Sequence, residues 1–390
     1  MSDMPKTLLP EGLRDLLPPE AMLEADVVHR LASSFGANGY ELVKPPLIEF
    51  EDTLLAGVGT ALRESIFRMP DPVSHRTLGV RADVTTQVAR IAATRLAQHA
   101  RPLRLMYVGP VLRVRGDQLE PERQFTQAGI ELIGVETGAA DAEVILATVE
   151  ALQAVGVQDI TVDLALPTLV PLILAAAGGI HDARLRTALD HKDIAEIKTA
   201  GGSAGALLTA LVEASGPFAV AIERVAKLKL PPTAQAEWDR LVVVARAVHE
   251  SAPDLALTVD AVESRGFEYH TGVTFSLFAR GAQREIGRGG RYRLSHGGEQ
   301  ATGATLLVDT LLNVVPPINA TQRLWVPFGT PRPAIRAWQG KGWIVLTGLE
   351  AGPAPEAEAI RLGCSHYLAD GGAVAVSSAK VPQKRTGKSG

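Results

Sequence analysis

The chain is organised around residues 103–134, which read LRLMYVGPVLRVRGDQLEPERQFTQAGIELIG. Two runs rich in apolar and β-branched residues flank a polar stretch at 116–122. Such an arrangement is typical of a β-hairpin with a long connection. We therefore predict two neighbouring strands here, against which the rest of the chain folds.

One face of this hairpin is predicted to carry polar groups. Successive residues of a strand point to opposite faces, so residues of one parity share a side. That side holds a phenol, a guanidinium, an amide and a carboxylate, from Tyr107, Arg113, Gln127 and Glu131. Gly109 and Gly129 lack side chains, so we expect room above the same face. Such groups around a hollow suit a small zwitterion, although a solvated sheet face with scattered polar residues explains the pattern equally well.

The composition indicates a globular protein of more than one domain. The 390 residues are 46% hydrophobic, enough for a sizeable core. A net charge of −4 gives no global basic field, so we expect no DNA partner. The longest uncharged run, residues 164–180, contains two prolines and is short for a membrane span, so we expect buried core and no membrane partner. The first residues, MSDMPK, lack the apolar region of a signal peptide, which favours a cytoplasmic location.

The sequence offers no pattern that binds a metal or a phosphate. The single cysteine, Cys364, excludes an internal disulfide and a multi-cysteine metal site. His181 and His191 stand ten residues apart without a third ligand nearby. We find neither a P-loop nor a serine-nucleophile elbow, so we predict no metal, no cofactor and no catalytic residue of those classes.

A second polar segment precedes a helix. Residues 81–85 read Arg-Ala-Asp-Val-Thr and lead into a run with apolar residues on one helical face. If the segment is extended, Arg81, Asp83 and Thr85 share a side. The simpler interpretation is that Asp83 or Thr85 caps the helix. A capping residue can also line a site, so the two roles are compatible.

We predict three parts along the chain. Residues 1–317 form the core, with a helical insertion at about 170–250, residues 318–378 form a small α/β domain, and residues 379–390 form a disordered basic tail. Within the core we expect an amphipathic helix after Pro18-Pro19, an edge strand at 40–50 and a helix at 141–155. Strands are predicted at 256–263 and 271–279, and an apolar helix at 303–315. Residues 288–292 fit a plain loop, because four of the five are charged or glycine.

Several motifs stand in a recognisable order. They are RADVT at 81–85, YVGP at 107–110 followed by Arg113, RQFTQAGIELIG at 123–134, RGFEYH at 265–270 and GGRY at 289–292. Together they resemble the class II aminoacyl-tRNA synthetase core and, within it, the histidyl-tRNA synthetase family. The resemblance covers roughly residues 10–315. It implies an α+β fold in which helices flank an antiparallel sheet.

The resemblance also implies a pocket for histidine. Asp83, Thr85 and Gln127 would hold the α-ammonium group, and Arg113 and Arg265 would meet the carboxylate. Glu131 would accept from one imidazole nitrogen, and Tyr269 or His270 would contact the other. The chemistry fits, because an ammonium needs acceptors, a carboxylate prefers arginine, and a neutral imidazole presents one donor and one acceptor. His270 departs from the family, which has tyrosine there.

The side of the pocket that would hold ATP departs further from the synthetases. Arg115 stands where the family has glutamate, and Thr310 stands where the family has the arginine that supports ATP. Adenylyl transfer depends on such cationic clamps, so these changes predict loss of catalysis.

A retained amino-acid site beside a lost nucleotide site is similar to the ATP phosphoribosyltransferase regulatory subunit family. That resemblance implies a non-catalytic chain that binds histidine and pairs with a short-form catalytic subunit, as a homodimer within a hetero-octamer. An active histidyl-tRNA synthetase with altered motifs is the alternative. A free-standing histidine-binding or RNA-binding regulator is a third reading, supported only by the basic tail.

Overall fold

The computed structural model describes residues 8–55, 60–116, 121–179, 183–263, 269–294, 298–317, 322–352 and 354–377. The chain divides into two compact units, Met1–Pro316 and Pro317–Gly390. Each is described by itself. The tail at 379–390, which we expect to be disordered, and the segment 264–268, which contains Arg265, lie outside the described residues.

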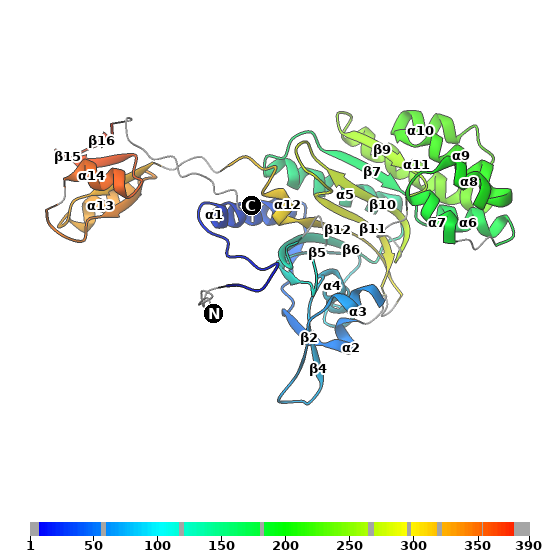
Figure 1. The fold of residues 1–390 in the computed structure, drawn as a ribbon, viewed down its shortest axis with the longest axis horizontal. Helices are drawn as coiled ribbons and strands as arrows, with labels where there is room; N and C mark the ends of the chain where they lie inside the picture. The colour runs from blue at the N-terminus through cyan, green and yellow to red at the C-terminus, as the bar shows by residue number, and fades with distance from the viewer. Residues whose placement is uncertain are drawn as a thin grey trace, which may run out of the picture. The chain divides into compact units, whose positions relative to one another are not determined.

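A nine-stranded sheet forms the centre of the first unit (Figure 1). Its pairs are mostly antiparallel, and the pairs β1–β5 and β7–β9 are parallel. In spatial order the strands are β1 (Glu41–Leu42), β5 (Leu103–Leu112), β6 (Gln124–Ile133), β12 (Gln300–Leu307), β11 (Gly287–Arg293), β10 (His270–Phe278), β7 (Thr161–Ala165), β9 (Ala256–Asp260) and β8 (Gly216–Pro217). This sheet confirms the predicted α+β fold.

The predicted hairpin is confirmed as β5 and β6. They pair antiparallel, with Tyr107 opposite Gly129, Gly109 opposite Gln127 and Leu105 opposite Glu131. Directly opposed residues of such a pair share a face. The register therefore places the polar side chains of both strands on one side of the sheet.

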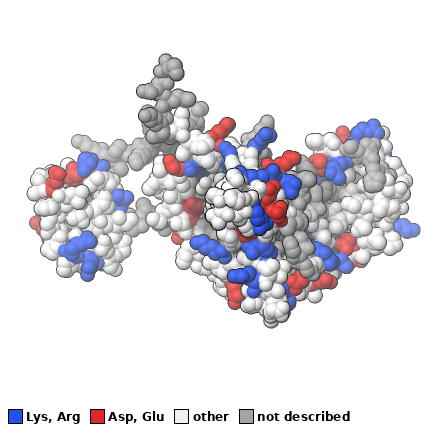
Figure 2. All heavy atoms as spheres, turned by 90° about the horizontal axis from the view of Figure 1, so that it is seen from below, with Lys and Arg blue, Asp and Glu red and all other residues white. Residues whose placement is uncertain are grey.

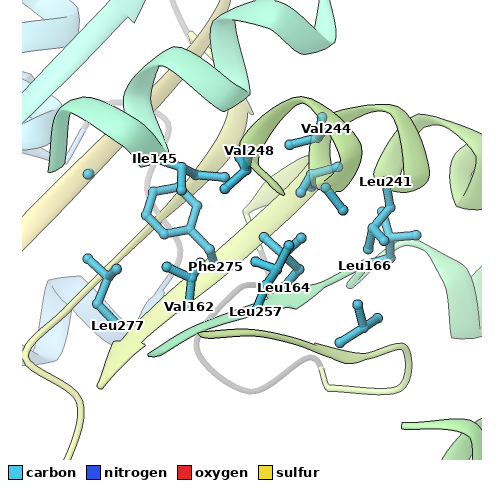
Figure 3. Close-up of a cluster of buried hydrophobic side chains, with 14 of the residues drawn as sticks. Ile145, Val162, Leu164, Leu166, Leu241, Val244, Val248, Leu257, Phe275 and Leu277 are labelled. Carbon is cyan, nitrogen blue, oxygen red and sulfur yellow. The ribbon is translucent and has the colours of Figure 1, made fainter. Parts of the chain in front are cut away.

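Long helices cover the other face of the sheet and form the main core. They are α1 (Glu20–Ala37), α5 (Gly138–Ala154) and α11 (Pro232–Ser251), with the short α12 (Val308–Leu311) after β12. Figure 3 shows Ile145 of α5 and Val248 of α11 packed against Phe275, Leu164 and Val162 of the strands. Because these helices bury the apolar side of β6, its polar side faces a different layer.

The layer over the polar face is smaller. It contains α4 (Thr85–Thr94), which contributes Val88 and Ala92 to a second buried cluster with Leu105 of β5. Nearby lie α2 (Glu51–Leu54), α3 (Thr60–Ser65) and a three-stranded sheet of β2 (Ile48–Phe50), β4 (Thr77–Val80) and β3 (Arg68–Pro70).

Helices also dominate the region between β7 and β9. They are α6 (Leu169–Ala176), α7 (Ala183–Asp190), α8 (Ile194–Ala200), α9 (Gly205–Ala214) and α10 (Phe218–Val225), with the short 3₁₀ turn η1 (Gly202–Ala204). Asp193 begins α8 by accepting hydrogen bonds from the main-chain N–H groups of Ala195 and Glu196. Ile197, Leu208 and Leu211 are fully buried in the same core cluster as the sheet.

The second unit is a small α/β fold, as predicted. Its sheet has the order β14 (Ile344–Thr347), β13 (Arg323–Val326), β15 (His366–Ala369) and β16 (Gly372–Ala375), with β16 antiparallel to the others. Ile335 of α13 (Arg332–Gln339) packs with Leu324 and Val326. Ala359 of α14 (Pro355–Arg361) packs with Trp325 in a separate cluster, so the two helices lie on opposite faces of the sheet.

Two predicted elements of the core are wrong. The predicted helix at 303–315 is instead the end of β12, the four-residue α12 and turns. The predicted loop at 288–292 lies inside β11. In both cases burial between neighbouring strands removes the alternation of polar and apolar residues that marks a half-buried strand.

Candidate functional site

Glu131 lies at the centre of the polar face. It is 1% exposed, and the Tyr292 hydroxyl donates to its Oε2 atom at 2.8 Å. Gly303 of β12 stands opposite, where a Cβ atom would lie 1.9 Å from Oε2. Burial raises the pKa of Glu131 to about 8, although the Tyr292 hydrogen bond lowers it. Burial therefore favours the protonated form of this carboxyl group.

Tyr107 connects this face to α4. Its hydroxyl lies 3.2 Å from Oγ1 of Thr85 and 2.7 Å from Oγ1 of Thr305, and the side chain is fully buried. A Cβ atom on Gly129 would lie 2.3 Å from the same hydroxyl. The room predicted above Gly129 is therefore occupied by Tyr107, because the aromatic ring lies across the neighbouring strand.

Asp83 and Gln127 form a clasp beside Tyr107. Gln127 donates from Nε2 to Oδ2 of Asp83 at 3.2 Å and accepts from the Val84 N–H at 3.1 Å. Oδ1 of Asp83 accepts from the N–H of Thr85, the first residue of α4, at 2.8 Å. Asp83 thus accepts from the first N–H of the helix, although Val84 and not Asp83 or Thr85 is the N-cap residue. Its other carboxylate oxygen lies beside Gln127 at the polar face.

Arg113 lies at one end of the polar face, just after β5. Its Cζ atom is 4.6 Å from the centre of the Phe125 ring, and its main-chain N–H donates to the Arg123 carbonyl at 2.7 Å. Phe125 shares the parity of Gln127 and Glu131 in β6. The guanidinium group therefore lies over Phe125, two positions before Gln127 in β6, on the predicted face.

Tyr269 and His270 lie at the opposite end, before and at the start of β10. Their ring centres are 3.9 Å apart, and Tyr269 meets Tyr292 edge to face at 6.0 Å. His270 is 7% exposed and pairs in register with Tyr292, whereas Tyr269 is 56% exposed. A Cβ atom on Gly290 would lie 2.9 Å from the His270 ring. The strand register thus places His270 on the same face of the sheet as Glu131, next to Tyr292.

Several known proteins are similar to this chain over most of its length. A model of the histidyl-tRNA synthetase family matches residues 12–311. The ATP phosphoribosyltransferase regulatory subunit of Paramagnetospirillum magneticum is 54% identical over 95% of this chain and 98% of its own length. That of Rhodospirillum rubrum is 48% identical over 94% of this chain and 96% of its own. The chain belongs to the ATP phosphoribosyltransferase regulatory subunit family.

Solved structures agree on the fold of this family member. An ATP phosphoribosyltransferase regulatory subunit/histidyl-tRNA synthetase from Bacillus halodurans C has a TM-score of 0.78 at 24% identity, covering 92% of this chain and 97% of that one. Histidyl-tRNA synthetase from Nostoc has a TM-score of 0.76 at 18% identity, covering 93% and 91%. At these identities the likeness concerns the fold, which confirms the class II synthetase-like core.

The region around Thr310 is narrow in this member of the family. Nε and Nη2 of Arg284 donate to Oγ1 of Thr310 at 3.1 and 2.8 Å. With Phe125 and Leu307 these residues line a cavity of about 20 Å³. Pockets that enclose a drug-sized ligand measure roughly 300–1,000 Å³. The described residues therefore enclose only a small space beside Thr310.

Two contributors to this face escaped the sequence-based prediction. Tyr292 is part of the recognised GGRY motif, but the sequence assigns it no partner, and Thr305 lies within the segment that we predicted to be helical. Only the strand register shows that both point to the polar side. The correct strand prediction for 300–307 would have revealed Thr305 by its parity with Gly303.

Metal-binding and membrane-spanning features are absent from the described part of the chain. Within the described ranges no group of three or more His, Cys, Asp or Glu residues could hold a metal ion. None of the described helices is long and apolar enough to cross a bilayer. Figure 2 shows acidic and basic side chains interspersed on one face of the large unit.

Proposed function

We propose that this chain is the regulatory subunit of an ATP phosphoribosyltransferase, the enzyme of the first step of histidine biosynthesis. It binds histidine, and it activates a short-form catalytic subunit and conveys feedback inhibition to it. The membership of a family with this name, at 54% identity over nearly the full length, supports the regulatory role. The proposed setting is the cytoplasm, and the proposed assembly is a hetero-octamer that contains homodimers of this chain.

The observation that carries histidine binding is the buried Glu131 carboxyl with its Tyr292 partner, on the same face as the Asp83–Gln127 clasp. In the proposed complex the clasp and Thr85 accept the α-ammonium group. Glu131 reads one imidazole nitrogen, and Tyr269 or His270 reads the other. Arg113 and Arg265 meet the carboxylate. A polar pocket of this kind rejects analogues that leave its buried groups unpaired.

The nucleotide side supports a non-catalytic chain. Thr310 carries no charge and accepts hydrogen bonds from Arg284. Arg115 is exposed and carries a charge opposite to that of the synthetase residue in its place. Adenylate formation needs positioned cations around a triphosphate, so we expect histidine to bind without being activated.

The decisive experiment is co-purification from cell extract, followed by an assay of the condensation of ATP with phosphoribosyl pyrophosphate. We expect a catalytic subunit to co-purify, its activity to depend on this chain, and added histidine to lower that activity. Activity that is independent of this chain would overturn the proposal.

The alternative is an active histidyl-tRNA synthetase, favoured by the match of residues 12–311 to that family. Purified protein should then catalyse histidine-dependent ATP–pyrophosphate exchange and charge histidine tRNA. We expect neither reaction.

A further inference from the structure

Arg81 is a buried cation in the first unit for which the proposed function gives no role. It is 4% exposed. Its Nε atom donates to the Pro110 carbonyl at 2.8 Å, and Nη1 donates to the Pro45 carbonyl at 3.1 Å and to Oε1 of Gln87 at 3.3 Å. All three acceptors are uncharged. Burial lowers the pKa of Arg81, against the attraction of the nearby Asp83 and Glu49 charges.

The guanidinium group fills the space that the sequence led us to expect above Gly109. A Cβ atom on Gly109 would lie 2.2 Å from Nη2 of Arg81. Gly109 stands directly opposite Gln127 in the β5–β6 register. Arg81 therefore lies beside the strand position that carries one half of the Asp83–Gln127 clasp, and glycine at 109 is required for it to do so.

The main chain of Arg81 is fixed as firmly as its side chain. Its N–H donates to the Leu47 carbonyl at 3.1 Å, and its carbonyl accepts from the Leu112 N–H at 3.0 Å. Two residues later, Asp83 is held by Gln127. The segment 81–85 is thus anchored at one end by Arg81 and at the other by the clasp.

We propose that Arg81 is a positioning residue for the ammonium side of the histidine pocket. It ties segment 81–85 to Pro45 and Pro110 at the outer edge of the sheet, so that Asp83 and Thr85 stand where an α-ammonium group can be accepted. Arg81 itself need not touch the ligand. The inference rests on the proposed function, because it concerns the same pocket.

The test compares three ligands on the full-length protein by calorimetry. Histidine carries ammonium, carboxylate and imidazole groups, histamine lacks the carboxylate, and imidazole-4-propionate lacks the ammonium. Arg81→Met should weaken histidine and histamine by similar factors, about 10-fold to 100-fold, as expected for misplaced hydrogen bonds to a charged group. It should leave the affinity for imidazole-4-propionate within about threefold of the wild type, well under the 1.4 kcal/mol that corresponds to a tenfold change.

Arg90→Met is the matched control. Arg90 lies on α4 and forms an ion pair with Glu49, so its loss also removes a half-buried cation from this layer. Among the described residues its side chain hydrogen-bonds to Glu49 and to no residue of segment 81–85, so the affinities for all three ligands should stay unchanged.

Gly109→Ala supplies a second variant that keeps Arg81 but displaces it. We expect the same ligand pattern as for Arg81→Met. Since methionine lacks the guanidinium that the alanine Cβ would strike, the double variant should lose less affinity than the product of the two single losses. Gly109→Ala alone still decides the question if Arg81→Met does not fold.

The outcomes separate the inference from the proposed function. Equal losses for all three ligands would make Arg81 a general structural residue, and no loss for any would remove its role altogether. Either result overturns the inference while histidine still binds to the wild type. Failure of the wild type to bind histidine would instead overturn the proposed function.

Discussion

Glu131 is the residue on which the proposed pocket most depends. It is buried, it accepts from Tyr292, and it stands over a strand position that only glycine can occupy. Its neighbours on β6 were placed on one face by parity alone, since the period of a strand is fixed. The sequence could not show that the carboxyl group is nearly inaccessible, because burial depends on Gly303 from a segment predicted to be helical.

Replacing Glu131 with glutamine tests the pocket directly. Glutamine keeps the size but cannot ionise, whereas the Glu131 carboxyl group can lose its proton and become a charged acceptor for a bound imidazole N–H. We expect histidine affinity to fall about 10-fold to 100-fold, the range for a hydrogen bond to a charged group. Calorimetry measures the change, and circular dichroism should show an unaltered fold. An unchanged affinity would mean that the pocket assignment is wrong.

The raised pKa of Glu131 also predicts a pH dependence of stability. In the unfolded chain the carboxyl group returns to an ordinary pKa of 4.5, compared with about 8 when folded. Between these values the folded protein holds a proton that the unfolded chain releases, so the free energy of unfolding falls as pH rises through this window. The limiting slope is about 1.4 kcal/mol per pH unit.

Urea denaturation of ligand-free wild type and Glu131→Gln at about pH 5.5 and about pH 8.5 measures this contribution. The wild type should lose stability relative to the variant as pH rises. Parallel curves for the two proteins would show that the carboxyl group titrates normally.

At the scale of elements, the clearest lesson comes from β11. Arg288 and Arg291 made residues 288–292 look like a loop, yet both have an acidic neighbour. Arg288 pairs with Glu285, and Arg291 reaches across to Asp141 at the start of α5. The sequence shows that Arg291 is charged, but it does not show that Asp141, 150 residues earlier, neutralises this charge. The β5–β6 hairpin was predictable because its pattern is local.

The Arg291–Asp141 pair should be a major contributor to the attachment of α5 to the sheet. Arg291 also donates to the carbonyls of Val135 and Thr137. Asp141→Ala leaves the buried guanidinium without its carboxylate, which typically costs about 3–5 kcal/mol. Chemical denaturation measures the loss. Glu20→Ala, which breaks the exposed pair with Arg14, is the control and should cost about 1 kcal/mol or less. Equal losses would contradict the special role of the buried pair.

For the whole molecule, the division after Pro316 separates the proposed pocket from the C-terminal unit. Every described residue of the polar face lies within Met1–Pro316. Removal of residues 317–390 should therefore leave histidine affinity within about threefold of the full chain, less than the factor of 10 that 1.4 kcal/mol represents. Calorimetry on the truncated protein gives the answer. A complete loss of binding, with the shortened chain still folded, would assign the C-terminal unit a part in the pocket.

The close approach of Gly303 to Glu131 gives metabolic engineers a position at which one small substitution would disturb the proposed pocket. An alanine at that position would displace the carboxyl group that is proposed to read the imidazole, without removing any polar side chain from the pocket. If the chain acts as the proposed regulatory subunit, this change would weaken its response to accumulated histidine, which is the property sought when an amino acid is to be overproduced.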